Sequence, residues 1–360
     1  MTVASRLAPL LLAWWDRHGR HDLPWQQDTT PYRVWVSEIM LQQTQVATVE
    51  RYYGRFMQSF PSVAALAAAT QDEVLHHWSG LGYYSRARNL HKAAQTVVAE
   101  YDGVFPTDIE RLTALPGVGR STAGAILALA CNHRQPILDG NVKRVLARLY
   151  ALEGWPGTTA NQKILWAYAE ACTPDSRVAN YTQAIMDLGA TVCTRSKPRC
   201  EACPLQDLCA AHAKSLTGVI PASKPRKPRP RRAAVLVMAV DQDGAVLLEK
   251  RPPAGIWGGL WSFPELDSLD AVDEWCVQQL GVESPAKTVW SDVSHSFSHF
   301  DFDMRPVEIK MDAGLRTQPA AVMEGERWLW YNTRSPADVG LAAPVAKLLQ
   351  TFDRRTGGQE

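Results

Sequence analysis

Apolar residues recur with the period of an α-helix along most of residues 1–222. Local sequence supports several of these helices: Pro31 suits the first position of a helix, and Thr70–Glu73 has the residues of a capping box. Gly80–Gly82 interrupts the pattern before the next helix. The helices expected in this all-α domain cover residues 32–53, 62–69, 84–101, 121–131, 141–152, 159–172 and 180–189.

The pattern changes after a short basic segment. Residues 224–232 hold six basic residues and three prolines, which is too much proline for a helix and too much charge for a core. We expect residues 223–232 to be a linker, either solvated or lying along a phosphate backbone. Beyond it, apolar runs on both sides of Asp241–Gly244 predict a β-hairpin of residues 235–240 and 245–248. The expected second domain, residues 233–356, is α+β, with strands near 297–302, 307–311 and 327–331 and helices near 268–280 and 336–352.

Composition narrows the class of protein. The chain has 360 residues, of which 46% are hydrophobic and 21% charged, as in a globular protein with two or three domains. No stretch is long enough to span a bilayer and no signal-peptide cleavage pattern appears, so we expect a cytoplasmic protein. The net charge is only +1, and any affinity for nucleic acid must therefore come from local basic patches.

A glycine-containing turn, Leu115–Gly119, joins two predicted helices. Thr107–Glu110 resembles a capping box for the first, and the second starts near Ser121. Unpaired amides at a helix N-terminus bind anions such as a DNA phosphate. An ordinary helix–helix turn is the alternative interpretation. The amides that we expect to be free are those of Val118, Gly119 and Arg120.

Asp139 lies twenty residues after Gly119 and just before another predicted helix. The commonest role of Asp at such a position is to cap the helix. Together, however, the turn and this Asp resemble the helix-hairpin-helix and the Asp that follows it in the DNA glycosylase superfamily of endonuclease III. A phosphate site and a carboxylate on one short segment suit chemistry at a sugar whose backbone is held nearby.

Four of the seven cysteines are spaced C-x6-C-x2-C-x5-C, which favours a metal site over disulfides. Four thiolates could hold zinc or an iron–sulfur cluster, but zinc ligands usually form two C-x2–4-C pairs, and only the middle pair here fits. The spacing resembles the iron–sulfur motif of endonuclease III and MutY glycosylases, which implies one 4Fe-4S cluster. Its ligands would be Cys193, Cys200, Cys203 and Cys209.

Glu38 lies among apolar residues at helical spacings, which is unusual for a surface glutamate. A core-edge glutamate paired with an arginine is the plain interpretation. Its surroundings, S-E-I-M-L-Q-Q-T from Ser37 to Thr44, resemble the MutY family of adenine DNA glycosylases, and the resemblance extends over nearly the whole chain.

The resemblance implies distinct tasks for two carboxyl groups. A protonated Glu38 would protonate N7 of the departing adenine and later activate water, which requires a raised pKa. An ionised Asp139 would stabilise the oxocarbenium-like sugar, electrostatically or through a transient bond to C1′. The base must first leave the duplex.

The residue after the G-V-G-R segment distinguishes two types of glycosylase. In bifunctional endonuclease III enzymes it is a lysine that attacks the sugar, whereas here it is Ser121. A monofunctional enzyme is therefore expected. Lys143 could still react adventitiously with the abasic product.

Further residues carry over from the family by position. The adenine pocket would be lined by Trp25, Gln26, Leu41, Val46 and Gln183. Tyr83 would wedge into the base stack, and Gln43 and Thr44 would touch the opposing base. One departure is His21, where the family usually has Arg or Lys. The remaining expected DNA contacts are Leu81, Gly82, Gly117, Val118, Gly119, Ser121, Asn141 and Lys143.

The second domain resembles the Nudix-like C-terminal domain of this family. Aligning Gly259 and Glu265 with the Nudix motif places Val277 and Gln278 where paired glutamates would bind Mg²⁺, so pyrophosphate hydrolysis is not expected. Phe297, Ser298 and His299 match the family's loop that contacts 8-oxoguanine. The plain interpretation of that loop is a β-strand with alternating side chains.

These features predict removal of adenine paired with 8-oxoguanine or guanine in double-stranded DNA. The expected enzyme is a monomer associated with the nucleoid. One rival is a bifunctional glycosylase and lyase for oxidised pyrimidines. The other is a non-catalytic DNA-binding or redox-sensing module that uses the cluster alone.

Overall fold

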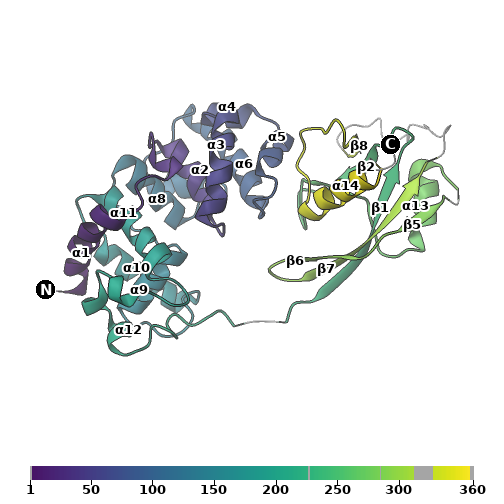
Figure 1. Ribbon diagram of the computed structural model, residues 1–360. Helices are drawn as coiled ribbons and strands as arrows, with labels where there is room; N and C mark the ends of the chain where they lie inside the picture. The colour runs from purple at the N-terminus through teal and green to yellow at the C-terminus, as the bar shows by residue number, and fades with distance from the viewer. Residues whose placement is uncertain (1, 226–227, 284, 312–326, 357–360) are drawn as a thin grey trace. The chain divides into compact units, whose positions relative to one another are not determined.

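Every secondary-structure element described in the first of the two structural units is a helix. The computed structural model describes residues 2–225, 228–283, 285–311 and 327–356. The first unit combines Met1–Ala68 with Asn89–Arg226, and the second combines Ala69–Arg88 with Lys227–Glu360 (Figure 1). The first unit contains α1 (Val3–His18), η1 (Pro24–Gln26), α2 (Pro31–Leu41), α3 (Val46–Ser59), α4 (Val63–Ala68), most of α6 (Ser85–Tyr101), α7 (Ile109–Ala114), α8 (Arg120–Cys131), α9 (Gly140–Leu149), α10 (Thr159–Cys172), α11 (Val178–Asp187), η2 (Leu188–Val192), η3 (Cys200–Ala202), η4 (Gln206–Leu208) and α12 (Ala210–Ala213).

Close backbone contacts hold the segment before Asp139 against α8. A Cβ on Gly124 would lie 2.6 Å from the carbonyl oxygen of Pro136, so only glycine allows this approach. The Ser121 hydroxyl accepts a hydrogen bond from the Leu138 amide at 2.9 Å. Because α2 and α11 also pack against α8, this helix organises the middle of the unit.

Two predictions for the first unit are wrong in detail. The helix expected over residues 32–53 is broken into α2 and α3, because Gln43 adopts a left-handed backbone with φ 59°. The cap of α7 is Asp108, whose carboxylate accepts from the Arg111 amide at 2.8 Å, and not Thr107. The capping box at Thr70 and Glu73 is confirmed.

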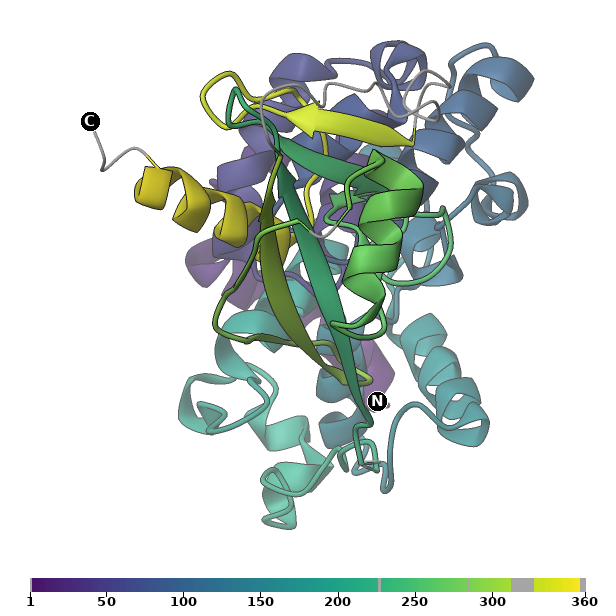
Figure 2. The same ribbon diagram turned by 90° about the vertical axis from the view of Figure 1, so that its right-hand side faces the viewer.

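The second unit is built on a mixed sheet. The long strands β1 and β7 run parallel over ten residue pairs and the other strands pair antiparallel, with the main order β3-β2-β1-β7-β5. In both views α13 and α14 lie on opposite sides of β1 and β7 (Figure 2). The elements are α5 (Gln71–Trp78), β1 (Arg231–Val240), β2 (Val246–Lys250), β3 (Trp261–Ser262), β4 (Glu265–Leu266), α13 (Ala271–Leu280), β5 (Lys287–Val289), β6 (Val293–Ser296), β7 (Asp301–Lys310), β8 (Trp328–Tyr331) and α14 (Ala343–Thr356).

The predicted fold class, a helical domain followed by an α+β domain, is confirmed, with corrections in the second unit. Residues 297–300 form the turn between β6 and β7 and not the expected strand. The expected linker ends earlier than predicted, because Arg231 and Arg232 pair with Asp301 and Phe302 as the start of β1. Helix α14 begins at Ala343 and not near Pro336. Arg226 and Lys227 of the linker, and residues 284 and 312–326 of the second domain, lie outside the described residues.

Candidate functional site

Glu38 and Asp139 come from different helices and interact electrostatically. Glu38 lies on α2, and burial together with the charge of Asp139 raises the pKa of its carboxyl to about 8. The Glu38 carboxyl accepts no hydrogen bond from the described residues. Nothing therefore favours its ionised form, and it holds a proton at neutral pH.

Asp139 is the N-cap of α9, as the plain interpretation predicted, and its carboxylate has more hydrogen-bond donors around it than that of Glu38. Its carboxylate accepts from the Val142 amide at 2.8 Å and from the Asn141 side-chain amide at 3.1 Å. Burial raises the pKa of Asp139, while these bonds and the charge of Arg144 oppose the rise. Burial raises the pKa of both carboxyl groups, but only Asp139 has hydrogen-bond donors and a nearby arginine that oppose the rise, so of the two Glu38 is the better candidate to hold a proton.

A cavity of about 270 Å³ opens next to α2, and neither Glu38 nor Asp139 is among its lining residues. Val34 and Ser37, which precede Glu38 on the same side of α2, line it. Of the five residues expected in the base pocket, Trp25, Gln26 and Gln183 line this cavity, whereas Leu41 and Val46 do not. Its volume is slightly below that of the pockets that bind drug-sized ligands, which suits a single base. Its remaining lining residues are Trp15, His21, Thr29, Leu129, Ala179 and Asn180.

The helix-hairpin-helix turn leaves a different set of amides free from the one predicted. The Val118 amide donates to the Leu115 carbonyl at 3.1 Å, and the Val118 side chain is buried. The start of α8 instead leaves the amides of Gly119, Arg120, Ser121 and Thr122 without a partner among the described residues. Gly117 adopts φ 77°, a conformation that favours glycine. The free amides of the α8 N-terminus therefore start one residue further along than expected, and anion binding there stays a prediction.

The other residues expected to contact DNA differ in how exposed their side chains are. Gln43, in the break between α2 and α3, is exposed, and Tyr83 is 46% exposed with a left-handed backbone. Thr44 and Lys143 are half-buried, and Leu81 is buried. The side chain of Asn141 donates to Asp139 and accepts from Arg144, so it serves the carboxylate site directly.

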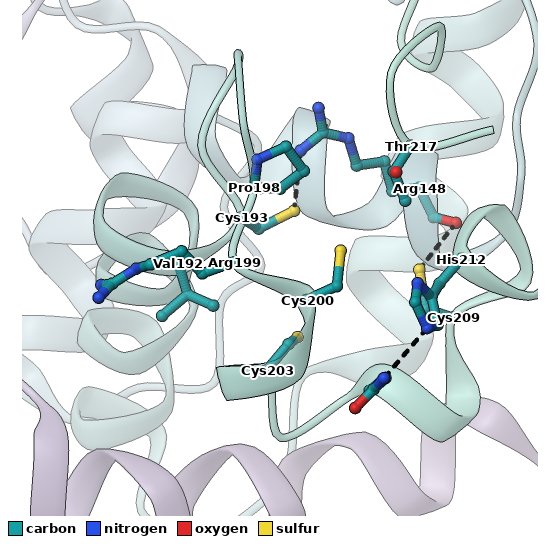
Figure 3. A pocket seen from close by; sticks show the side chains of 11 residues that line it. Arg148, Val192, Cys193, Pro198, Arg199, Cys200, Cys203, Cys209, His212 and Thr217 are labelled. Atoms are coloured by element: carbon teal, nitrogen blue, oxygen red, sulfur yellow. Dashed lines mark hydrogen bonds between the residues drawn. The ribbon is translucent and has the colours of Figure 1, made fainter. Parts of the chain in front are cut away.

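The four cysteine thiols surround one cavity (Figure 3). All seven cysteines lie in described parts of the chain, and none forms a disulfide. Among the described residues no group of three or more His, Cys, Asp or Glu side chains is placed to hold a single metal ion. Burial, first, and the neighbouring thiols raise the pKa of Cys203 to about 12. Four cysteine side chains around one cavity are the donor set of an iron–sulfur cluster, so these residues fit one.

A buried arginine supports this cysteine loop. Arg148, which is 2% exposed, donates to Cys193 Sγ at 3.3 Å and to the Thr194 carbonyl at 2.7 Å. It also donates to the Ile220 carbonyl at 2.8 Å. A positive charge so placed compensates the thiolates and anchors the loop.

A second cavity lies within the second unit. Tyr83, Phe297, Ser298 and His299, all expected to contact DNA, line it together with Gly82. Ser298 and His299 are exposed in the turn between β6 and β7, while Phe297 stacks on Phe300 at 4.5 Å between ring centroids. The turn geometry overturns the plain β-strand interpretation of these residues.

Sequence reasoning missed two residues at these cavities. The Asp187 carboxylate accepts a hydrogen bond from Gln183, which lines the first cavity. Trp257, with φ 53°, packs against Phe297 in the second cavity. Neither belongs to a recognisable motif. A lone acidic residue near the end of an apolar helix was the signal available for Asp187.

Comparisons with known proteins agree with this arrangement. Three family models match: a HhH-GPD superfamily base excision DNA repair protein over residues 36–171, the iron-sulfur binding domain of endonuclease III over 193–209, and a NUDIX domain over 235–351. The second match confirms the predicted 4Fe-4S cofactor. No helix among the described residues is long and apolar enough to cross a membrane.

Similar relatives extend over nearly the whole chain. The adenine DNA glycosylase of Buchnera aphidicola (subsp. Acyrthosiphon pisum) is 37% identical, covering 96% of this chain and 97% of its own. The human adenine DNA glycosylase is 36% identical, covering 97% of this chain and 74% of its own. A solved thermostable thymine-DNA glycosylase matches 59% of this chain and 97% of its own, with a TM-score of 0.53 and 27% identity. The chain therefore belongs to the adenine DNA glycosylases, base excision repair enzymes that hydrolyse N-glycosyl bonds.

Proposed function

We propose that this enzyme removes adenine paired with 8-oxoguanine, and more weakly adenine paired with guanine, from double-stranded DNA. The observation that carries the proposal is the asymmetric carboxyl pair. Glu38 has a pKa of about 8 because of burial and the charge of Asp139, while Asp139 accepts hydrogen bonds from two groups. In the proposed reaction Glu38 holds the proton, and Asp139, which has the hydrogen-bond donors that Glu38 lacks, carries the charge, an arrangement that suits the loss of a neutral base from a cationic sugar.

The proposed reaction assigns each group a task. Glu38 delivers its proton to N7 of the flipped adenine, so the base leaves without a negative charge. Asp139 stabilises the positive charge that develops on the sugar. Glu38, then ionised, takes a proton from the water that attacks C1′. The helix α8 N-terminus binds a nearby phosphate through its free amides and keeps the sugar in place.

Ser121 supports a monofunctional reaction. Its hydroxyl accepts from the Leu138 amide, so it braces the segment that carries Asp139. A serine provides no amine to form a Schiff base with the sugar. Strand cleavage is therefore not part of the proposed activity.

The opposing base is proposed to contact the cavity of the second unit. Phe297 offers an aromatic face, and the exposed Ser298 and His299 offer polar groups for a base edge. Cys193, Cys200, Cys203 and Cys209 would hold the iron–sulfur cluster, which would fix the loop between them. The basic residues of this loop, Arg195, Lys197 and Arg199, would then meet phosphates.

A single-turnover assay on three duplexes tests the proposal. Adenine release is measured opposite 8-oxoguanine and opposite guanine, and a thymine-glycol duplex is incubated with borohydride. We expect release in the first, slower release in the second, and no trapped covalent complex in the third. Efficient trapping on thymine glycol would support the bifunctional rival, and duplex binding without any base release would support the non-catalytic one.

A further inference from the structure

Asp187 is the most heavily hydrogen-bonded side chain beside the base cavity. Its side chain is 1% exposed, and its two carboxylate oxygens accept five hydrogen bonds. The donors are Trp15 Nε1 at 3.0 Å, the Arg20 backbone amide at 2.9 Å, Arg20 Nε at 2.9 Å, Arg20 Nη2 at 2.6 Å and Gln183 Nε2 at 2.9 Å.

This network fixes the orientation of the Gln183 amide. A carboxylate paired with an arginine can only accept, so Gln183 must turn its NH2 group toward Asp187. The opposite orientation would set a carbonyl oxygen against a carboxylate oxygen, at a cost of about 1–3 kcal/mol. Gln183 also lines the cavity, and no described residue donates to its Oε1 atom. The cavity therefore contains an unpaired acceptor.

Two other polar side chains around the cavity, those of Gln26 and Ser37, are already engaged in hydrogen bonds. Gln26 uses both ends of its amide, accepting from the Leu23 amide at 3.1 Å and donating to the Arg20 carbonyl at 2.9 Å. The Ser37 hydroxyl donates to the Val34 carbonyl at 2.8 Å. The Asn180 side chain also lines the cavity and makes no hydrogen bond to a described residue, so its amide can turn either way. Gln183 Oε1 is therefore the unused acceptor whose orientation the protein fixes.

We infer that Asp187 is a positioning residue that selects a 6-amino purine over a 6-oxo purine by holding the Gln183 carbonyl toward the base. The amino group of adenine donates to this oxygen. The 6-carbonyl of hypoxanthine would oppose it, leaving two buried acceptors unpaired. The inference rests on the proposed function, because it concerns the base that the enzyme releases.

The test compares adenine and hypoxanthine in otherwise identical duplexes opposite 8-oxoguanine. Single-turnover rates are measured for wild type, D187N, Q183A and the double variant, and each is expressed as the ratio of the adenine rate to the hypoxanthine rate. An asparagine can donate to Gln183 Oε1, which lets the amide turn. We expect D187N and Q183A each to lower the ratio about tenfold, from the same 1–3 kcal/mol per unpaired group. The double variant should fall no further than Q183A, because the effect of Asp187 passes through Gln183.

A matched control is the ion pair of Asp16 with Arg177, which joins α1 to the start of α11 but is exposed. D16N should leave the ratio unchanged. A ratio that D187N leaves unchanged, or an additive fall in the double variant, would overturn the inference. If D187N does not fold, the change from wild type to Q183A still tests the orientation for adenine, unsubstituted purine and hypoxanthine. An inward carbonyl predicts that Q183A slows adenine release most, unsubstituted purine less, and hypoxanthine least, whatever the intrinsic reactivity of each base. Failure of the proposed function would be seen separately, as no adenine release by wild type.

Discussion

The two cavities that hold the predicted recognition residues are built in opposite ways. In the first unit Gln183 is buried and its NH2 group is bonded to Asp187, and the half-buried Gln26 is bonded to two backbone groups. In the second unit Ser298 and His299 are exposed in a turn, and Tyr83 is 46% exposed. The first cavity is therefore set before any ligand binds, whereas the second relies on side chains that a ligand must order. Variants in the first should change the chemical step, and variants in the second should change binding.

The largest effect should come from the acid. E38Q keeps the shape of the side chain but has no proton to give to the base, so the single-turnover rate should fall by about 10³-fold or more. Binding of the same duplex, measured by fluorescence anisotropy, should change less than threefold, since about 0.7 kcal/mol is below the value of a typical hydrogen bond.

D139N provides the companion measurement for the carboxylate. Asparagine keeps the acceptor for the Val142 amide but loses the charge, so the rate should fall by about 10²–10³-fold. Weak binding with an unaltered chemical rate in either variant would contradict the comparison, because it would assign these groups to recognition.

The pH profile should show the protonated acid directly. Glu38 has a pKa of about 8, so the proton is present below that value and is lost above it. The single-turnover rate should fall about tenfold per pH unit above pH 8, measured on a duplex held saturating at each pH. A decline that already begins near pH 5 would indicate an acid with an ordinary pKa and would disagree with the buried setting of Glu38.

The sequence predicted the elements where local signals are strong. The capping box at Thr70 and the turn at Asp241–Gly244 are local features, and both lie where the pattern indicated. The break after Leu41 was missed because Gln42–Gln45 has neither glycine nor proline and continues the helical period. Tertiary contact with α8, where Gln42 donates to Thr122 at 3.4 Å, accompanies the break.

The functional sites also divide into features that local sequence predicts and features that depend on tertiary contacts. The cysteine spacing is a local motif and predicted the cofactor. The orientation of Gln183 depends on Asp187, Arg20 and Trp15, which lie up to 172 residues apart in the chain. No periodicity or spacing encodes such a contact. The strand expected at residues 297–302 is confirmed only for residues 301 and 302, which begin β7, whereas residues 297–300 form the turn, because alternation of side chains over so short a segment does not distinguish a strand from a hairpin turn.

The second cavity should respond with smaller effects on affinity. F297A removes an aromatic face, and Y83A removes an exposed ring; each should weaken binding of the adenine:8-oxoguanine duplex about five- to tenfold, from about 1–1.4 kcal/mol of lost stacking. The rate at saturating enzyme should stay within about twofold of wild type, since less than 0.5 kcal/mol is expected from changes remote from the carboxyl pair.

V289A is the matched control for F297A, since Val289 is 52% exposed on β5 of the same sheet. It should leave affinity unchanged. If the chemical rate of F297A falls as much as its affinity, the second cavity does not act on binding alone, and the proposed difference between the two cavities is wrong.

The smallest expected effect concerns stability, and it tests whether Glu38 lowers the free energy of unfolding as pH rises. In the unfolded chain Glu38 ionises near its ordinary pKa of 4.5, whereas in the folded enzyme it keeps its proton up to about pH 8. The folded state therefore binds more protons than the unfolded state over this interval, and the wild type loses stability as pH rises through it. Glutamine has no proton to lose, so the free energy of unfolding of E38Q relative to wild type should increase from pH 5 to pH 8. We expect a gain on the order of 2 kcal/mol, below the full linkage value because the side chain is partly accessible. Urea unfolding followed by circular dichroism would measure it, with E50Q at the exposed Glu50 of α3 as the control. Equal pH dependence in all three proteins would mean that the buried carboxyl is not strained by its surroundings, and the raised pKa on which the proposed mechanism depends would lose its support.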